Sequence, residues 1–143
     1  MLWVVDELMT LKAPAEHTGG AYSLTDSVVP SGGGPPPHVH HQEHEAFWVL
    51  EGELEVQVGE STFRANAGSF VHLPKGIPHA YQNIGTEPAR FLTLMVPGGL
   101  ETFFEDLGKP GTELSSPPPF EEDLAKFLAV APRYGAEILL PDS

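Results

Sequence analysis

Residues 32–52 read GGGPPPHVHHQEHEAFWVLEG and contain the pattern that decides the fold of this chain. His38 and His40 are two positions apart, so on a β-strand their imidazoles point to the same face and can reach one ion. Glu45 follows after four more residues, which is enough for the chain to turn and return a carboxylate to that side. The stretch therefore predicts β-structure with three metal-ligating side chains on one face.

A second informative stretch, residues 68–83, reads GSFVHLPKGIPHAYQN. His79 comes directly after a tight turn that contains two prolines and a glycine, and it begins another predicted strand. Three neutral imidazoles and one carboxylate suit a divalent transition metal, and four protein ligands leave two positions open on an octahedral ion. We therefore expect one ion per chain, Fe, Ni, Mn, Cu or Zn, held by His38, His40, Glu45 and His79.

Together the two stretches resemble the two sequence motifs of the cupin superfamily, with every motif position filled. The positions are Gly32, His38, His40, Glu45 and Gly52 in the first motif, and Gly68, Pro74, Gly76, His79 and Asn83 in the second. Chance rarely produces two such patterns in one short chain. The resemblance implies a jelly-roll β-barrel with the metal inside, and it assigns the ligand role to the same three histidines and Glu45. The runs PPPHVH and AFWVLEGE also resemble small single-domain cupins grouped with quercetin 2,3-dioxygenases.

Around these motifs, short runs rich in Val, Phe, Leu and Thr recur about every ten residues, which is typical of antiparallel β-proteins. Together they predict an antiparallel sandwich or barrel, and the resemblance to cupins implies that it is an all-β jelly-roll barrel. We expect strands at 21–29, 46–51, 54–58, 61–65, 69–73, 79–83 and 89–96.

The sequence pattern changes after Gly98. Residues 100–107 predict a short helix, 109–119 an irregular connector rich in proline, and apolar residues at helical spacing predict a second helix from 120 to 131. A chain of 143 residues fits one domain. We divide it into an N-terminal extension (1–20), a cupin barrel (21–98) and a C-terminal helical segment packed on the barrel (99–143).

The side chains of the pocket follow from strand alternation. If Glu45 points inward, Phe47 and Val49 do so too, while Trp48 and Leu50 face outward. The same alternation from His79 turns Tyr81 inward. For the strand 91–96, either face could be the inner one. The candidate pocket residues are Phe47, Val49, His72 and Tyr81, although His72 fits a hydrogen-bonded core position equally well.

Three other residues near the motifs compete for a place in the site. His41 is out of phase with His40, and His44 stands in the predicted loop, so we expect both outside the metal centre. Glu43 is a second carboxylate in the same loop, and the motif spacing favours Glu45 over it.

Charge and composition exclude several classes of function. The chain has 7 basic and 20 acidic residues, a formal charge of −13, which opposes binding to nucleic acid and to anionic membranes. There is no cysteine, so disulfides and thiolate metal sites are excluded. No signal peptide or membrane span is apparent, and we expect a cytoplasmic protein. The apolar residues 2–5 predict a strand that a second copy could cover, so we expect a homodimer.

Three functions are compatible with this reading. The first is a metal-dependent dioxygenase for a small aromatic or enolic substrate, with Glu45 as the base that takes the substrate's proton. The second is a non-enzymatic, metal-containing module that binds a small molecule. The third, a sugar isomerase or epimerase, is less favoured because the barrel region has only Arg64, Lys75 and Arg90 to bind a phosphate.

Overall fold

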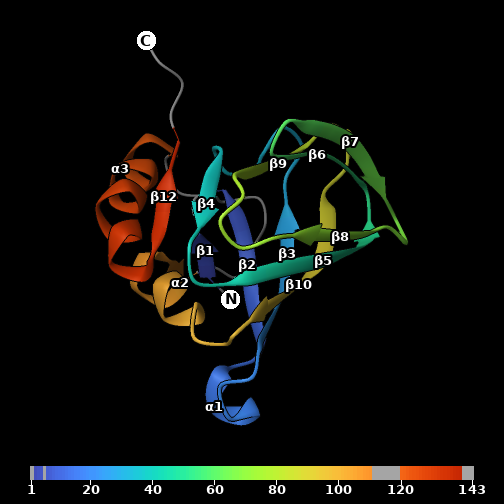
Figure 1. Cartoon of the computed structure of the whole chain (residues 1–143). Helices are drawn as coiled ribbons and strands as arrows, with labels where there is room; N and C mark the ends of the chain where they lie inside the picture. Colours follow the sequence, from blue (N-terminus) through green and yellow to red (C-terminus); the bar gives the residue numbers. More distant parts are fainter. Residues whose placement is uncertain (1, 5, 111–119, 140–143) are drawn as a thin grey trace.

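Two antiparallel β-sheets face each other in the computed structural model, which describes residues 2–4, 6–110 and 120–139 (Figure 1). The larger sheet has the order β11-β1-β2-β3-β10-β5-β8. Its strands are Lys109–Pro110 (β11), Leu2–Val4 (β1), Glu7–Ala13 (β2), Ser23–Val29 (β3), Ala89–Val96 (β10), His44–Glu51 (β5) and Phe70–Leu73 (β8). The smaller sheet has the order β12-β4-β9-β6-β7. Its strands are Ala136–Ile138 (β12), His38–His40 (β4), His79–Asn83 (β9), Glu53–Val58 (β6) and Ser61–Asn66 (β7).

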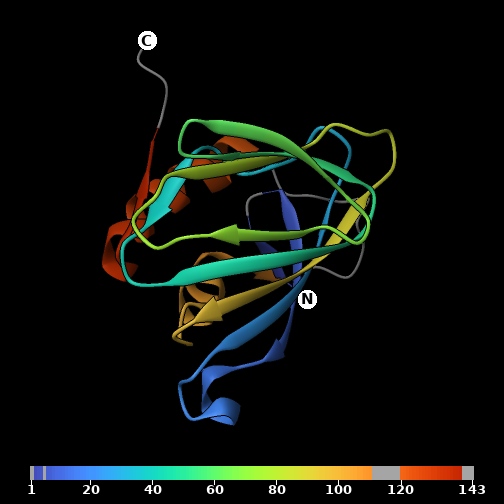
Figure 2. The same cartoon turned by 45° about the vertical axis from the view of Figure 1, so that its right-hand side comes forward.

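From β3 to β10 the chain passes repeatedly between the two sheets, which Figure 2 shows with the smaller sheet above the larger one. This is the predicted jelly-roll arrangement. The predicted strands 79–83 and 89–96 are β9 and β10 with the same bounds, and the other five differ from the structure by one or two residues at their ends.

Alternation along the strands places the core between the sheets as the sequence predicts. On β5, Phe47 is 1% exposed while its neighbour Trp48 is 55% exposed. The open question about the strand 91–96 is answered as well. Phe91, Thr93 and Met95 are buried on the inner face of β10.

The segment 1–20 contributes two strands to the larger sheet. β2 pairs with β3 from Leu8↔Val28 onward, and β1 pairs with β2 on one side and with β11 on the other. The sequence predicted that a second copy would cover the apolar residues of β1. They are instead covered within the chain, where Trp3 and Val4 are buried. A short helix, α1 (Ala15–Thr18), separates β2 from β3.

Two helices and a 3-10 turn cover one end of the sheets: α2 (Glu101–Leu107), α3 (Phe120–Val130) and η1 (Ala131–Tyr134) (Figure 1). Phe103 packs against Phe127 and Tyr134, with ring centroids 5.5 and 5.2 Å apart. The helix predicted to end near Pro132 ends at Val130, where the 3-10 turn begins. Most of the predicted connector, residues 111–119, lies outside the described residues. None of the helices in the described parts of the chain is long and apolar enough to cross a bilayer.

Candidate metal centre

The strand β4 is only three residues long, and both of its ends are histidines. It lies between β9 and β12, with His38 directly opposite His79 and Ile138. The His38 Nδ1 lies 2.8 Å from the carbonyl oxygen of Pro36. Because a carbonyl can only accept, Nδ1 carries the hydrogen and donates it. The other ring nitrogen, Nε2, therefore keeps a free lone pair for a metal.

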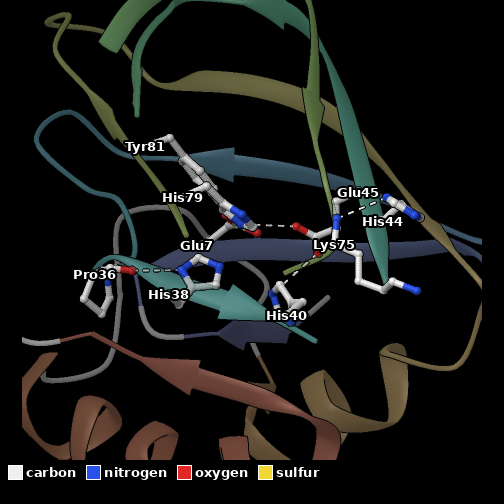
Figure 3. Close-up of polar contacts among 9 residues, drawn as sticks. All are labelled: Glu7, Pro36, His38, His40, His44, Glu45, Lys75, His79 and Tyr81. Atoms are coloured by element: carbon white, nitrogen blue, oxygen red, sulfur yellow. Dashed lines mark hydrogen bonds and ion pairs between the residues drawn. The ribbon is translucent and has the colours of Figure 1, made fainter. Parts of the chain in front are cut away.

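Three imidazoles meet at this point of the fold (Figure 3). In His38, His40 and His79, one ring nitrogen of each lies within 4.8 Å of the others, and all three side chains are buried. Both ring nitrogens of His79 and Nδ1 of His40 are buried without a hydrogen-bond partner among the described residues. Buried polar atoms without partners are uncommon, and they are what a metal-binding cluster presents before the ion is added. The three histidines fit a divalent ion.

The buried carboxylate of Glu45 reaches this cluster from the larger sheet. Its Oε1 lies 3.7 Å from His40 Nε2, and its Oε2 lies 3.4 Å from His79 Nε2. The carboxylate is therefore directed at the space between two imidazoles, as Figure 3 shows. The chemistry of the full set, three imidazoles and one carboxylate, suits Fe, Mn, Ni, Cu or Zn.

Burial and mutual contact change the pKa values of these groups. Burial, assisted by His79 and His40, lowers the pKa of His38 to about 3. Burial also lowers the pKa of His40, against the opposing effect of Glu45. For Glu45, burial acts to raise the pKa, but His40 and His79 outweigh it and the pKa falls to about 2. At neutral pH, His38 and His40 are thus neutral and Glu45 is ionised, the protonation states that metal binding requires.

The competing residues of the 41–44 region lie elsewhere. His41 is exposed, with its Nε2 3.4 Å from Glu137. His44 is exposed too, and its Nδ1 accepts a hydrogen bond of 3.1 Å from the backbone N–H of Lys75. Glu43 is buried but takes no part in the histidine cluster, and burial raises its pKa to about 7.

A small cavity, with a volume of about 50 Å³, adjoins the metal centre. That is room for a few water molecules, so it favours a small ligand over a large one. Its lining residues are Val4, Asp6, Glu7, Met9, Thr25, Pro35, His38, His40, Glu45, Phe47, Leu73, Tyr81, Thr93, Phe103, Phe104 and Phe127.

Two of the four predicted pocket residues line this cavity, and two do not. Phe47 and Tyr81 are among the lining residues, with their rings 5.6 Å apart. Val49 is fully buried deeper in the core, among residues such as Leu54 and Phe91. The prediction for His72 is wrong, because the alternation of β8 turns its side chain outward, where it stacks on His44 at 6.0 Å.

Sequence reasoning missed the acidic residues at the start of β2, Asp6 and Glu7, which line the cavity next to the histidines. A signal was present, because these are two charged residues inside an otherwise apolar segment, MLWVVDELMTL. It also missed Phe103, Phe104 and Phe127, which bring aromatic rings from the helices to the cavity.

Comparison with known proteins agrees with the fold. Residues 26–96, about half of the chain, match the family Cupin_2, described as a cupin domain. Quercetin 2,3-dioxygenase of Bacillus subtilis (strain 168) is 30% identical over 105 residues, covering 73% of this chain and 31% of the relative. Germin-like protein subfamily 2 member 3 of Arabidopsis thaliana is 34% identical over 134 residues, covering 85% and 56%. The solved structure of a predicted oxalate decarboxylase from Thermotoga maritima superimposes with a TM-score of 0.61 at 22% identity, covering 64% and 80%.

The two facing sheets and the buried cluster of three histidines are those of a cupin. The chain belongs to the cupin superfamily and is of the quercetin 2,3-dioxygenase-like type. It spans about a third of the length of the Bacillus enzyme and just over half that of the plant protein.

Proposed function

We propose that this chain is a metal-dependent dioxygenase that acts on a small aromatic or enolic substrate. The observation that carries the proposal is a cluster of three imidazoles with the Glu45 carboxylate beside it, of which His38, His40 and Glu45 also line a small cavity. The likeness to quercetin 2,3-dioxygenase supports the same class of reaction.

In this proposal, His38, His40, Glu45 and His79 hold the ion, whose identity is one of Fe, Ni, Mn, Cu or Zn. The metal, when bound, would lower the pKa of a substrate hydroxyl, and Fe, Ni, Mn or Cu would also supply redox chemistry for dioxygen, which Zn would not. Glu45 accepts the hydroxyl proton on one of its carboxylate oxygens. Its low pKa in the metal-free site keeps it ionised. As a ligand it can take the proton only if the substrate oxygen replaces it in neutralising the charge of the ion.

The aromatic side chains of the cavity hold the substrate and keep water away from it. Phe47 and Tyr81 come from the two sheets, while Phe103 and Phe127 come from α2 and α3. Rings packed edge to face in this way favour a flat, apolar ligand with few polar groups. A sugar phosphate fits less well, because none of the described residues that line the cavity is Lys or Arg.

Elemental analysis tests the metal site. The double variant His38→Ala, His40→Ala should lose the ion, while His41→Ala, His44→Ala, which removes two histidines outside the cluster, should keep one ion per chain. Stoichiometric metal in the first variant would refute the ligand assignment.

Oxygen consumption tests the reaction. The fully metal-loaded protein should consume dioxygen with at least one compound in a panel of small phenols and enols. If some of these compounds bind but none supports oxygen uptake, a non-enzymatic binding module is the better interpretation.

We also keep the homodimer as a proposal, although its expected contact, β1, is covered within the chain. Support comes from the outer face of β5 and β8, where Trp48 is paired with Phe70, which is 67% exposed. A large apolar surface of this kind is a candidate contact between copies. Light scattering at micromolar concentration should give the mass of a dimer, and a monomer mass would end the proposal.

A further inference from the structure

The wall of the cavity beside the histidines is acidic and comes from outside the cupin motifs. It consists of Asp6 and Glu7, at the start of β2, which we call the acidic wall. Figure 3 shows Glu7 beside Tyr81 and behind the histidines. Both residues lie outside the segment 26–96 that matches the cupin family.

Glu7 is fixed in place by two donors. Its Oε2 accepts a hydrogen bond of 2.9 Å from Ser27 Oγ, and its Oε1 accepts one from the Tyr81 hydroxyl. Each carboxylate oxygen has two lone pairs, so each keeps room for one more donor. The carboxyl group is therefore rigid and still able to accept a hydrogen bond from a ligand.

Two further polar atoms at the cavity lack partners. Asp6 Oδ2 accepts a hydrogen bond of 3.0 Å from the Gly34 N–H, but Asp6 Oδ1 is buried and has no partner in the described parts of the chain. The same is true of the hydroxyl of Thr25, which lines the cavity and is 1% exposed. Unpaired buried acceptors and hydroxyls cost free energy, and a bound ligand with hydroxyl groups would satisfy them.

The charges around the cavity are all of one sign. Asp6, Glu7 and Glu45 contribute three carboxyl groups, and the described lining includes no Lys or Arg to balance them. Burial raises the pKa of Asp6, and it raises that of Glu7 to about 7, so Glu7 carries its full negative charge only above that pH. A ligand that brings another negative charge would be attracted by a bound ion, but at its other end it would be repelled by these carboxylates in a region of low dielectric constant.

We propose that the acidic wall determines ligand selectivity: it accepts hydrogen bonds from an uncharged, hydroxyl-bearing ring or enol and disfavours carboxylates and phosphates. The inference rests on the proposed function, in which the opposite end of the ligand binds the ion of the metal centre. It adds Glu7 and Asp6 as residues that contact the ligand, with Thr25 as an additional hydrogen-bonding group.

Calorimetric titration of the full, zinc-loaded chain without oxygen tests this selectivity. The two probes are catechol and oxalate, which can both chelate a metal through two oxygens. Catechol enters the site uncharged and gives up protons on chelation, whereas oxalate enters with two negative charges and no proton to give. Glu7→Gln keeps the shape of the side chain and removes its charge. It should lower the ratio of the oxalate Kd to the catechol Kd by about tenfold or more, since a like-charge contact is lost.

Two more variants complete the test. Asp6→Asn should shift the ratio in the same direction, and it decides the question if Glu7→Gln does not fold. Glu60→Gln makes the same change of net charge at an exposed turn and should leave the ratio as in the wild type. A merely structural role for the acidic wall would weaken both probes together and leave the ratio unchanged.

An unchanged ratio in every folded acidic-wall variant would overturn the proposal, and so would a wild-type protein that does not bind catechol at millimolar concentration. Because binding is measured without oxygen or turnover, this outcome is separate from the test of dioxygenase activity. A protein can pass one and fail the other.

Discussion

At the level of single residues, the site depends most on Glu45, whose two oxygens face two different imidazoles. Glutamine has nearly the same shape but no charge and no basic oxygen. The change therefore separates the part that Glu45 plays in holding the ion from the part that it plays as a base.

Glu45→Gln should keep metal, held by three imidazoles and an amide, and lose turnover by about 10²-fold or more, the usual contribution of a general base. Elemental analysis and oxygen uptake measure the two effects on the same sample. Glu43→Gln, a change of a buried carboxyl outside the histidine cluster, is the control. Near-native turnover in Glu45→Gln would show that this residue is only a ligand.

Glu7 makes a prediction about pH and stability in the metal-free protein. Burial raises its pKa from 4.5 to about 7 on folding, so the folded chain binds the proton more tightly between these pH values. Its contribution to the free energy of unfolding is full below about pH 4.5 and is lost as the pH rises through 7. Between pH 4.5 and 8, the free energy of unfolding of Glu7→Gln should therefore rise by on the order of 2 kcal/mol relative to that of the wild type.

Urea denaturation at a series of pH values measures this difference. Asp6, whose pKa is also raised, is present in both proteins, so its titration cancels to first order. A difference in free energy that stays constant with pH would contradict the predicted pKa of Glu7.

At the level of elements, the glycines of the segment 32–37 stand where the backbone has a positive φ or comes close to another backbone. Gly34 has φ +155°, and a Cβ built on it would lie 2.0 Å from the carbonyl oxygen of Tyr81. Gly32 has φ +80° but open space around its Cβ position. Gly34 is therefore needed both for its conformation and for the close contact, whereas Gly32 is needed for conformation alone.

Gly34→Ala should destabilise the fold by about 2–4 kcal/mol, because the methyl group must push β9 and the segment before His38 apart. It should also weaken metal binding, since His79 is on β9. Gly32→Ala should cost only about 1 kcal/mol and leave the metal affinity unchanged. Thermal unfolding and a competitive zinc titration measure both effects. Equal losses in the two variants would contradict the steric explanation.

The elements that the sequence predicted well are those with a strong local pattern. A short run rich in Phe, Leu, Thr and Val identified the strand 89–96 to the residue, and the four motif residues His38, His40, Glu45 and His79 do converge in the structure. The strands β1, β4, β11 and β12 have two or three residues each, too few for a periodic pattern. Their existence depends on partners far away in the chain.

The same reasoning explains the errors at the site. His72 was placed by its position before the second motif, but only the register of β8 against β5, Ala46↔His72, decides which way it points. Glu7 reaches the cavity because β2 pairs with β3 and Ser27 and Tyr81 hold its carboxyl. Neither contact leaves a local signature in the sequence.

At the level of the whole molecule, the metal centre depends on residues from near both ends of the described chain. β12 pairs with β4 along its whole length, and the Leu139 N–H donates a hydrogen bond of 2.7 Å to the carbonyl of Pro37. The segment after α3 therefore holds the strand that carries His38 and His40. The division of the chain into an extension (1–20), a barrel (21–98) and a helical segment (99–143) stays a proposal. In the structure these three parts contact one another extensively.

Leu139→Pro removes that N–H and should lower metal affinity about tenfold, the low end of what is usual for groups that support metal ligands. Leu139→Ala keeps the N–H and is the matched control. Zinc affinity, measured by competition with a chelator, compares the two variants. Equal affinities would show that β12 has no influence on the site.

The pairing of β4 with β12 has a consequence for how the protein is made. His38 and Ile138 are a hundred positions apart, and bringing such distant segments together is the slow part of folding for proteins of this topology. On a ribosome, the histidines of β4 emerge long before residues 136–138 do. Until then the strand has a free edge, and its imidazoles lack their final support. The strand that carries His38 and His40 therefore gains its second neighbour only after residues 136–138 have been made.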